Sequence, residues 1–374
     1  MKRITKLKTN LKILMILAVA VLFVAAIVLL STQRSISEDK LSEAIEGGEL
    51  TLTSVGRNYE SLIMFVQNDE AQARQLLEGA RATLENAVIK INSARHTSDE
   101  YVLGMLNNYQ RMTQASSVMA QGVDNLLFVS ENLTDAIYYY SQKNFDEASR
   151  QASYCLQILT PLLSDFETAN TTLDDINIFY IPSGQQNRLT FGINQFRNET
   201  EIYNQYILLL QSLLEGKDYL QQNALLEEYL MQLQSAITNK DYQTAQGLIQ
   251  RISEILQSLQ GQEYQNAADT ASHLNPNLLS GTTSAVAQEL RNRLRDLKGI
   301  DAFENYLQSL EKYLEALRHF EQGETAEAEQ LINVGLGILA QGQGGDSELQ
   351  GLYEGLREAF NTLQLRIKGQ PDQG

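Results

Sequence analysis

The side chains best suited to catalysis or metal binding stand far apart in this sequence. Its three histidines are His96, His273 and His319, and neither a His-x-x-x-His nor a Glu-x-x-His spacing occurs to place two metal ligands on one helix face. Two of them, His96 and His273, fall at expected helix ends, where a histidine commonly meets free carbonyl groups. The histidines therefore predict no metal centre.

Nucleophiles and phosphate-binding loops are equally poorly supported. The single cysteine, Cys155, falls on an expected helix face, so we expect a buried, inert thiol, and a disulfide within the chain is impossible. Residues 335–340, Gly-Leu-Gly-Ile-Leu-Ala, match a dinucleotide fingerprint in letters but follow no expected strand, which favours helix packing. No serine has the context of a nucleophile. We predict no catalytic, cofactor-binding or metal-binding residues, no cofactor and no enzyme activity.

An apolar-periodic helix with a start signal and a stop signal recurs along the chain. In residues 299–328, apolar side chains follow the i, i+3, i+4, i+7 spacing that lines one helix face. A Gly-x-acid triplet precedes this helix, and a short polar turn that ends in alanine follows it. Three other stretches share both features, which predicts a degenerate repeat of four helical hairpins. The triplets begin at Gly47, Gly122, Gly216 and Gly299, and the turns end at Ala73, Ala148, Ala245 and Ala328, at separations of 26, 26, 29 and 29 residues.

Two of the turns resemble those of a known repeat family. Lys143-Asn144-Phe145 with Ala148, and Lys240-Asp241-Tyr242 with Ala245, are similar to the helix-to-helix turn of tetratricopeptide repeats, where a small alanine lets two helices approach closely. The resemblance covers only about a dozen residues per copy and implies a local helix-turn-helix. Successive final alanines are 75, 97 and 83 residues apart, far beyond that family's period, so its peptide-binding groove is not carried over.

The N-terminus has the pattern of a membrane anchor. Residues 1–12 hold five basic residues and no acid, and residues 13–30 are apolar throughout, nearly long enough to cross a bilayer as a helix. The basic flank should stay cytoplasmic, which places the rest of the chain outside. A cleaved signal peptide is the alternative, but the apolar run is long and the nearest small-x-small triplet lies beyond Arg34. We favour an uncleaved signal anchor.

The charge of the exported part limits its partners. Removing the five basic residues of the tail leaves 24 basic against 46 acidic side chains, a formal charge of −22 for residues 13–374. Nucleic acid and anionic lipid headgroups are poor partners for such a surface. With one cysteine, stability must come from packing, and the chain is long enough for one large core or several small ones.

Prolines mark the expected joints between units. Pro182 follows a β-branched and aromatic run, Pro276 lies between two asparagines, and Pro161 follows Thr160 where a helix should restart or kink. The joints and turns divide the chain into a sequence of predicted parts. These are a basic tail (1–12), the anchor (13–30), four helical units (31–98, 99–182, 183–276 and 277–345), and a capping helix with the C-terminal tail (346–374).

The sequence also contains a run of tyrosines and three glycosylation sequons. Residues 138–140 are consecutive tyrosines that point in three directions around a helix, so at least one ring should face outward or into a neighbouring subunit. Core packing is the stronger explanation for the run as a whole. Glycosylation sequons begin at Asn132, Asn170 and Asn198; chance produces such triplets readily, but an exported domain could use them.

The patterns together predict an all-α protein: an N-terminal transmembrane helix followed by an array of long antiparallel hairpins, either repeat-like or bundle-like. We expect a membrane-anchored extracytoplasmic scaffold that binds a protein partner, with self-association left open. A ligand-sensing helical ectodomain is the alternative. Because only a dozen residues would remain inside, its signal would need a partner.

Overall fold

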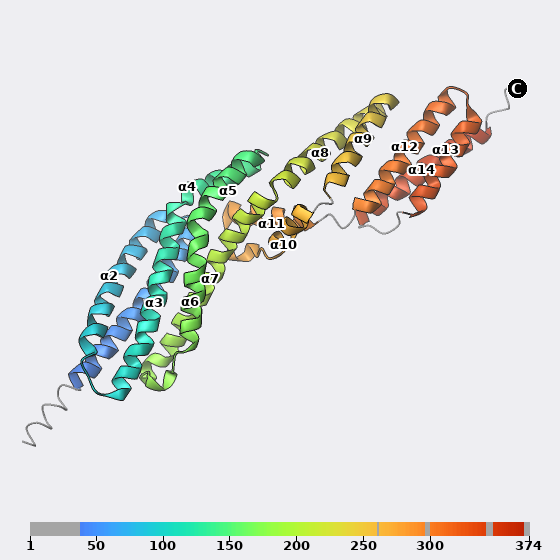
Figure 1. Ribbon diagram of the computed structural model, residues 1–374. Helices are drawn as coiled ribbons and strands as arrows, with labels where there is room; N and C mark the ends of the chain where they lie inside the picture. Colours follow the sequence, from blue (N-terminus) through green and yellow to red (C-terminus); the bar gives the residue numbers. More distant parts are fainter. Residues whose placement is uncertain (1–37, 260–261, 296–299, 342–346, 370–374) are drawn as a thin grey trace, which may run out of the picture. The chain divides into compact units, whose positions relative to one another are not determined.

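The computed structural model describes residues 38–259, 262–295, 300–341 and 347–369, and every regular element within these ranges is a helix (Figure 1). The all-α prediction is confirmed for this part of the chain. None of the described helices is long and apolar enough to cross a membrane. The predicted basic tail (1–12) and anchor (13–30) lie outside the described residues, so the anchor stays a prediction.

The helices form two compact units, each built from two stretches of chain. Unit 1 contains the described residues up to Phe128 together with Leu159–Asn204, and unit 2 contains Val129–Ile158 together with the described residues from Gln205 onward. These two compact units do not show how many repeats the chain contains. The division into four repeat units therefore remains a prediction.

Unit 1 is a bundle of long helices around an apolar core. The helix over residues 38–66 and α3 contribute most of its buried polar groups, and α6 packs against α3. Its elements are the helix over 38–66, α2 (Glu70–Ala94), α3 (Glu100–Phe128), the 3-10 turn η1 (Thr160–Leu162), α6 (Leu163–Asp174), the 3-10 turn η2 (Ile178–Tyr180) and the first part of α7 (Ser183–Glu215).

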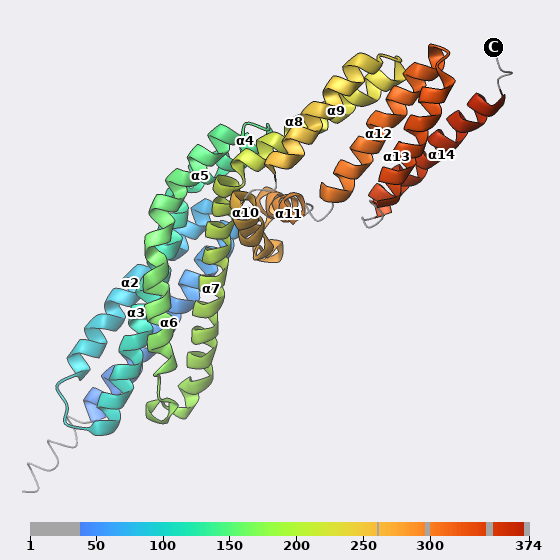
Figure 2. The ribbon, with the colours of Figure 1, turned by 45° about the vertical axis from the view of Figure 1, so that its right-hand side comes forward.

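Unit 2 consists of shorter helices in successive pairs. In both views α12, α13 and α14 lie side by side, and α12 also packs against α9 (Figures 1 and 2). Besides the end of α7, its elements are α4 (Ser130–Ser141), α5 (Phe145–Leu159, of which the last residue belongs to unit 1), α8 (Lys217–Thr238), α9 (Tyr242–Ser258), α10 (Gln262–Ser272), the 3-10 turn η3 (Pro276–Leu278), α11 (Gly281–Arg295), α12 (Ile300–Glu321), α13 (Thr325–Gln341) and α14 (Ser347–Gly369).

The four predicted turns are present and share one backbone conformation. They join the helix over 38–66 to α2, α4 to α5, α8 to α9, and α12 to α13. In each turn one residue takes the left-handed conformation, which helices commonly use to end. These residues are Asn68, Lys143, Lys240 and Gly323, with φ of 65°, 57°, 60° and 85°.

The hydrogen bonds of the turns are also the same. The residue after the left-handed one donates its N–H to the carbonyl five residues back, the 6→1 bond of a Schellman motif, at 2.9 Å in all four turns. That residue also begins the next helix. In three turns the side chain of this residue caps the new helix. Asp69 accepts from the N–H of Gln72, Asn144 from that of Glu147, and Asp241 from that of Thr244. Thus a single residue closes one helix and opens the next.

The final alanines of the turns are buried, as their small size predicts. Ala73, Ala245 and Ala328 are 0% exposed and Ala148 is 1% exposed. Further from the turn, the first and last hairpins share a buried bond at equivalent positions. Ser54 donates to the carbonyl of Ala80 at 2.9 Å, and Ser309 donates to that of Gly335 at 2.8 Å, with 26 residues between donor and acceptor in both cases. These two hairpins therefore share their helix-to-helix contact as well as their turn.

In unit 2, lysines of the turns reach the next hairpin. Lys143 forms an ion pair with Glu227 of α8 at 2.8 Å, and Lys240 forms one with Glu321 of α12 at 3.2 Å. In each case the acceptor belongs to the first helix of the following hairpin. Such exposed pairs contribute only about 0–1 kcal/mol each, so apolar packing must supply most of the stability between hairpins.

The prediction that a Gly-x-acid triplet opens each repeat helix is wrong for the first two copies. Gly47 and Gly48 lie inside the helix over 38–66, and Gly122 lies inside α3. A Cβ on Gly48 would lie 2.2 Å from the ring of Tyr109, so this glycine admits an aromatic ring rather than breaking the helix. The chain breaks at Val129 instead. Of the other copies, Gly216 does separate α7 from α8, and Gly299 lies outside the described residues.

The structure confirms that Pro161, Pro182 and Pro276 interrupt the helices, whereas their role as joints between repeat units stays a prediction. Pro161 lies in η1, where α5 ends and α6 begins. Pro182 immediately precedes α7, and Pro276 opens η3 between α10 and α11. At these positions the missing N–H and the fixed φ of proline interrupt the helices.

We predict that the turn alanines set the distance between paired helices. Ala245→Leu and Ala328→Leu should each destabilise the protein by about 1–3 kcal/mol, the usual cost of overpacking. The exposed Gln243 offers a control in the same turn, and Gln243→Leu should change little. Urea denaturation measures all three. Unchanged midpoints for both alanine variants would mean that the alanines do not hold the helices at close contact.

Two glycines of one helix make a matched test of the aromatic contact. Gly48 faces the ring of Tyr109, whereas a Cβ on Gly56 would meet nothing within 4 Å. Gly56→Ala should stabilise the helix by about 0.5–1 kcal/mol. Gly48→Ala should instead destabilise it by about 1–3 kcal/mol, because the ring must move. Equal effects of the two substitutions on thermal unfolding would contradict the close contact.

Candidate functional site

The histidines have local structural partners or face solvent. His96 is exposed, and the His273 ring lies 2.8 Å from the carbonyl of Asp269, which confirms its expected place at a helix end. His319 bonds to Glu324 across the fourth turn. Among the residues that the structure describes, no group of three histidine, cysteine or acidic side chains could hold a metal ion.

The single thiol is buried, as predicted. Cys155 is 0% exposed, and its Sγ lies 4.0 Å from the carbonyl of Val129. Burial raises the pKa of the Cys155 thiol to about 12. Because the thiolate is the nucleophile, the side chain is unreactive near neutral pH.

The glycine-rich match at 335–340 is explained by helix packing. These residues lie within α13, and a Cβ on Gly335 would stand 2.3 Å from the ring of Phe360 in α14. The glycine therefore lets an aromatic ring approach the backbone. A phosphate-binding loop would need free N–H groups after a strand, and a helix interior offers none.

The tyrosine run and the sequons face different environments. Tyr138 is 56% exposed while Tyr140 is 4% exposed, so one ring does face outward. Of the sequon asparagines, Asn132 donates to Gln151 and Asn170 accepts from Arg197, whereas Asn198 is exposed. Whether any carries a glycan stays a prediction.

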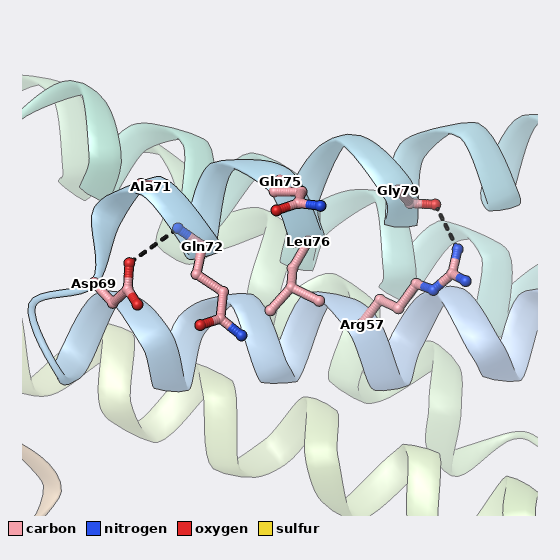
Figure 3. Close-up of a pocket in the computed structure, with 7 residues that line it drawn as sticks. All are labelled: Arg57, Asp69, Ala71, Gln72, Gln75, Leu76 and Gly79. Carbon is pink, nitrogen blue, oxygen red and sulfur yellow. Dashed lines mark hydrogen bonds between the residues drawn. The ribbon is translucent and has the colours of Figure 1, made fainter.

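The first hairpin bears an open groove of about 610 Å³ (Figure 3). Its two charged side chains already bond to the hairpin itself. Arg57 donates to the carbonyl of Gly79 at 3.0 Å, and Asp69 caps α2 through the N–H of Gln72. The other lining side chains are amides or aliphatic groups, so this groove offers few polar contacts that could select a ligand. Its lining is Arg57, Asp69, Ala71, Gln72, Gln75, Leu76 and Gly79.

A second groove, here called the α8 groove, lies in unit 2 between the turn of the second hairpin and α8. Its volume is about 560 Å³. Most of its lining comes from α8 at positions spaced i, i+3, i+4, i+7, so the groove follows one helix face. The lining residues are Lys143, Phe145, Gln221, Ala224, Leu225, Glu227, Glu228 and Met231.

The middle of α8 lacks the cover that an apolar helix normally has. Between the buried Leu220 and Leu233 no residue of α8 is buried, although half of this stretch is apolar. Leu225 is 44% exposed and Met231 is 67% exposed. Clustered apolar exposure of this kind marks interaction surfaces on soluble domains.

Acidic groups flank the α8 groove. Glu227 accepts from Lys143 at 2.8 Å and from Arg293 at 3.1 Å, and these cations lower the pKa of its carboxyl, chiefly through the Lys143 bond. Glu228 is exposed beside it and accepts from Gln232 of the next turn. The lining thus holds two acidic side chains and one lysine.

Comparison of the chain with protein-family models, with curated proteins and with solved structures finds no match in any of the three. Sequence reasoning missed the α8 groove, although one signal was available: residues 224–231 carry apolar side chains all around the helix, more than a single hairpin partner can cover.

Proposed function

We propose that this protein is a membrane-anchored extracytoplasmic scaffold that binds a partner protein through the α8 groove. The observation that carries the proposal is the uncovered apolar face of α8, which exposes Leu225 and Met231. A partner helix laid along this face would bury both side chains. Recognition of an amphipathic helix by an apolar groove is a recurring mode of protein binding.

Charge narrows the class of partner. Glu227 already pairs with Lys143 and Arg293. Glu228 is therefore the lining acid without a cationic partner among the described residues, and the chain carries a formal charge of −17. A helix with apolar residues on one face and lysine or arginine at its edges complements this surface. A second copy of so acidic a chain is repelled at long range, which makes self-association through this groove the less favourable outcome.

The membrane attachment in this proposal rests on the sequence. The basic residues 1–12 and the apolar residues 13–30 support an anchor that leaves the helical units outside the cytoplasm. Such an anchor would hold the α8 groove at one membrane surface, where its partner would be recruited.

One observation favours a second candidate function, a ligand-sensing ectodomain. Unit 1 buries the carboxyl group of Glu199 with no hydrogen-bond partner. Buried ionisable groups of this kind often respond to their chemical environment. A sensor of this layout would need a partner to carry its signal across the membrane.

We predict that Leu225 lies against the partner. A photo-crosslinking side chain placed at position 225 in the full-length protein, in its native membrane, should give a discrete adduct. The same side chain at position 365 is the control, because Leu365 is 72% exposed on α14 of the same unit. The crosslinked peptide should be an amphipathic helix with basic edges. No adduct at 225, or identical adducts at both positions, would contradict the proposal, and so would a crosslinked peptide from this same chain.

The topology has its own test. Protease added to intact cells should digest the helical units and leave a short membrane-bound stub, because the basic tail keeps the N-terminus inside. Immunoblotting against tags at either end follows both products. Complete protection of the chain in sealed, right-side-out cells would rule out the proposed orientation.

A further inference from the structure

Glu199 is the one acidic or basic side chain that is buried in the described part of the chain. It is 1% exposed and lies in the unit 1 portion of α7. Neither carboxyl oxygen has a hydrogen-bond partner. Native proteins rarely leave a buried polar group in this state, and each instance calls for an explanation.

The register of α7 places Glu199 in the core of unit 1. Gly192, seven residues earlier on the same helix face, lies against Met112 of α3 and against Leu52 and Val55 of the helix over 38–66, at 3.3 to 3.6 Å from its would-be Cβ. Gln185, a further seven residues back, bonds to Tyr109 of α3 and to the carbonyl of Ile45. This stripe of α7 therefore faces both helices, and Glu199 continues it.

The charged groups on the surrounding helices lie at the surface of unit 1. The helix over 38–66 carries Arg57 and Glu60 near this level, α3 carries Arg111 and Asp124, α6 carries Asp165, Glu167 and Asp174, and α7 carries Arg197 and Glu201. Arg197 pairs with Asp174 at 2.6 Å, and Asp124 pairs with Arg81 of α2 at 2.9 Å. Of the tyrosines, Tyr203 is buried and donates to the carbonyl of Leu159, and Tyr59 of the helix over 38–66 is partly exposed.

An ionised carboxylate in this place would be strongly destabilising. Removing an unpaired charge from water is strongly unfavourable, so the group takes up a proton instead. Burial alone raises the pKa of the Glu199 carboxyl well above 4.5. The neutral acid can stay in the core, whereas the anion gains by reaching water.

We propose that Glu199 is a proton-binding site that couples the packing of α7 to pH. When it is protonated, α7 stays closed on α3 and the helix over 38–66. When it is ionised, this part of α7 opens toward solvent. The inference is independent of the α8 groove, which belongs to unit 2.

The sign of the effect follows from proton linkage. The folded state holds the Glu199 proton at pH values where the unfolded chain has already lost it. As pH rises above 4.5, the ratio of folded to unfolded protein should therefore fall by up to tenfold per pH unit. The decline stops once pH exceeds the pKa of the folded state. Stability from this group is present in full only at acidic pH.

The test compares full-length wild type with Glu199→Gln in detergent micelles from pH 5 to pH 8. Urea denaturation reports the overall pH slope, and amide hydrogen exchange, corrected for its intrinsic pH dependence, reports opening around residues 195–203. In wild type, protection of these residues should fall as pH rises. In Glu199→Gln it should stay constant, because the amide cannot ionise.

Two further variants separate this role from a merely structural one. Glu201→Gln removes an exposed carboxyl two residues away on the same helix and should keep the wild-type pH slope. Glu199→Leu replaces the carboxyl with an apolar side chain. It should remove the pH dependence of stability as Glu199→Gln does, whatever its effect on absolute stability. The same slope in wild type and both Glu199 variants, or no pH dependence of exchange around residues 195–203 in wild type, would overturn the proposal.

Discussion

Close approach of two helices at each turn is the constraint on which the rest of the structure depends. Helix axes come closest where the side chains between them are smallest, and a buried alanine occupies this place in every hairpin (Ala73, Ala148, Ala245 and Ala328). The turn also leaves few backbone groups unpaired, since one residue closes the first helix and opens the second. The hydrogen bonds of each turn are therefore local to its own hairpin.

Away from the turns, each unit has one unusual feature of packing. Unit 1 buries Glu199, the one acidic or basic side chain that is buried among the described residues, and its glycines admit rings such as that of Tyr109. Unit 2 leaves the middle of α8 uncovered, so that Leu225 and Met231 remain open to solvent. A core that buries one acid without a hydrogen-bond partner suits a response to protonation. An under-covered helix suits the binding of another chain.

The sequence predicted the turns and proline joints because each is encoded locally. Left-handed Asn68, the cap Asp241 and the kink at Pro161 need only their neighbours in the chain. It failed at Gly48 because glycine serves equally to end a helix and to admit a ring, and only the distant Tyr109 distinguishes the two. The candidate sites were missed for the same reason. Burial of Glu199 depends on helices far away in sequence, and so does the lack of cover over α8.

Residue-resolved hydrogen exchange of the turn amides tests the shared turn most directly. The N–H groups of Asp69, Asn144, Asp241 and Glu324 each bond to a carbonyl five residues back. A common turn predicts that all four exchange slowly, at rates close to those of the last bonded amides of the helices they close. Exchange at the rate of an open loop in two or more of them would contradict a repeat built on one turn.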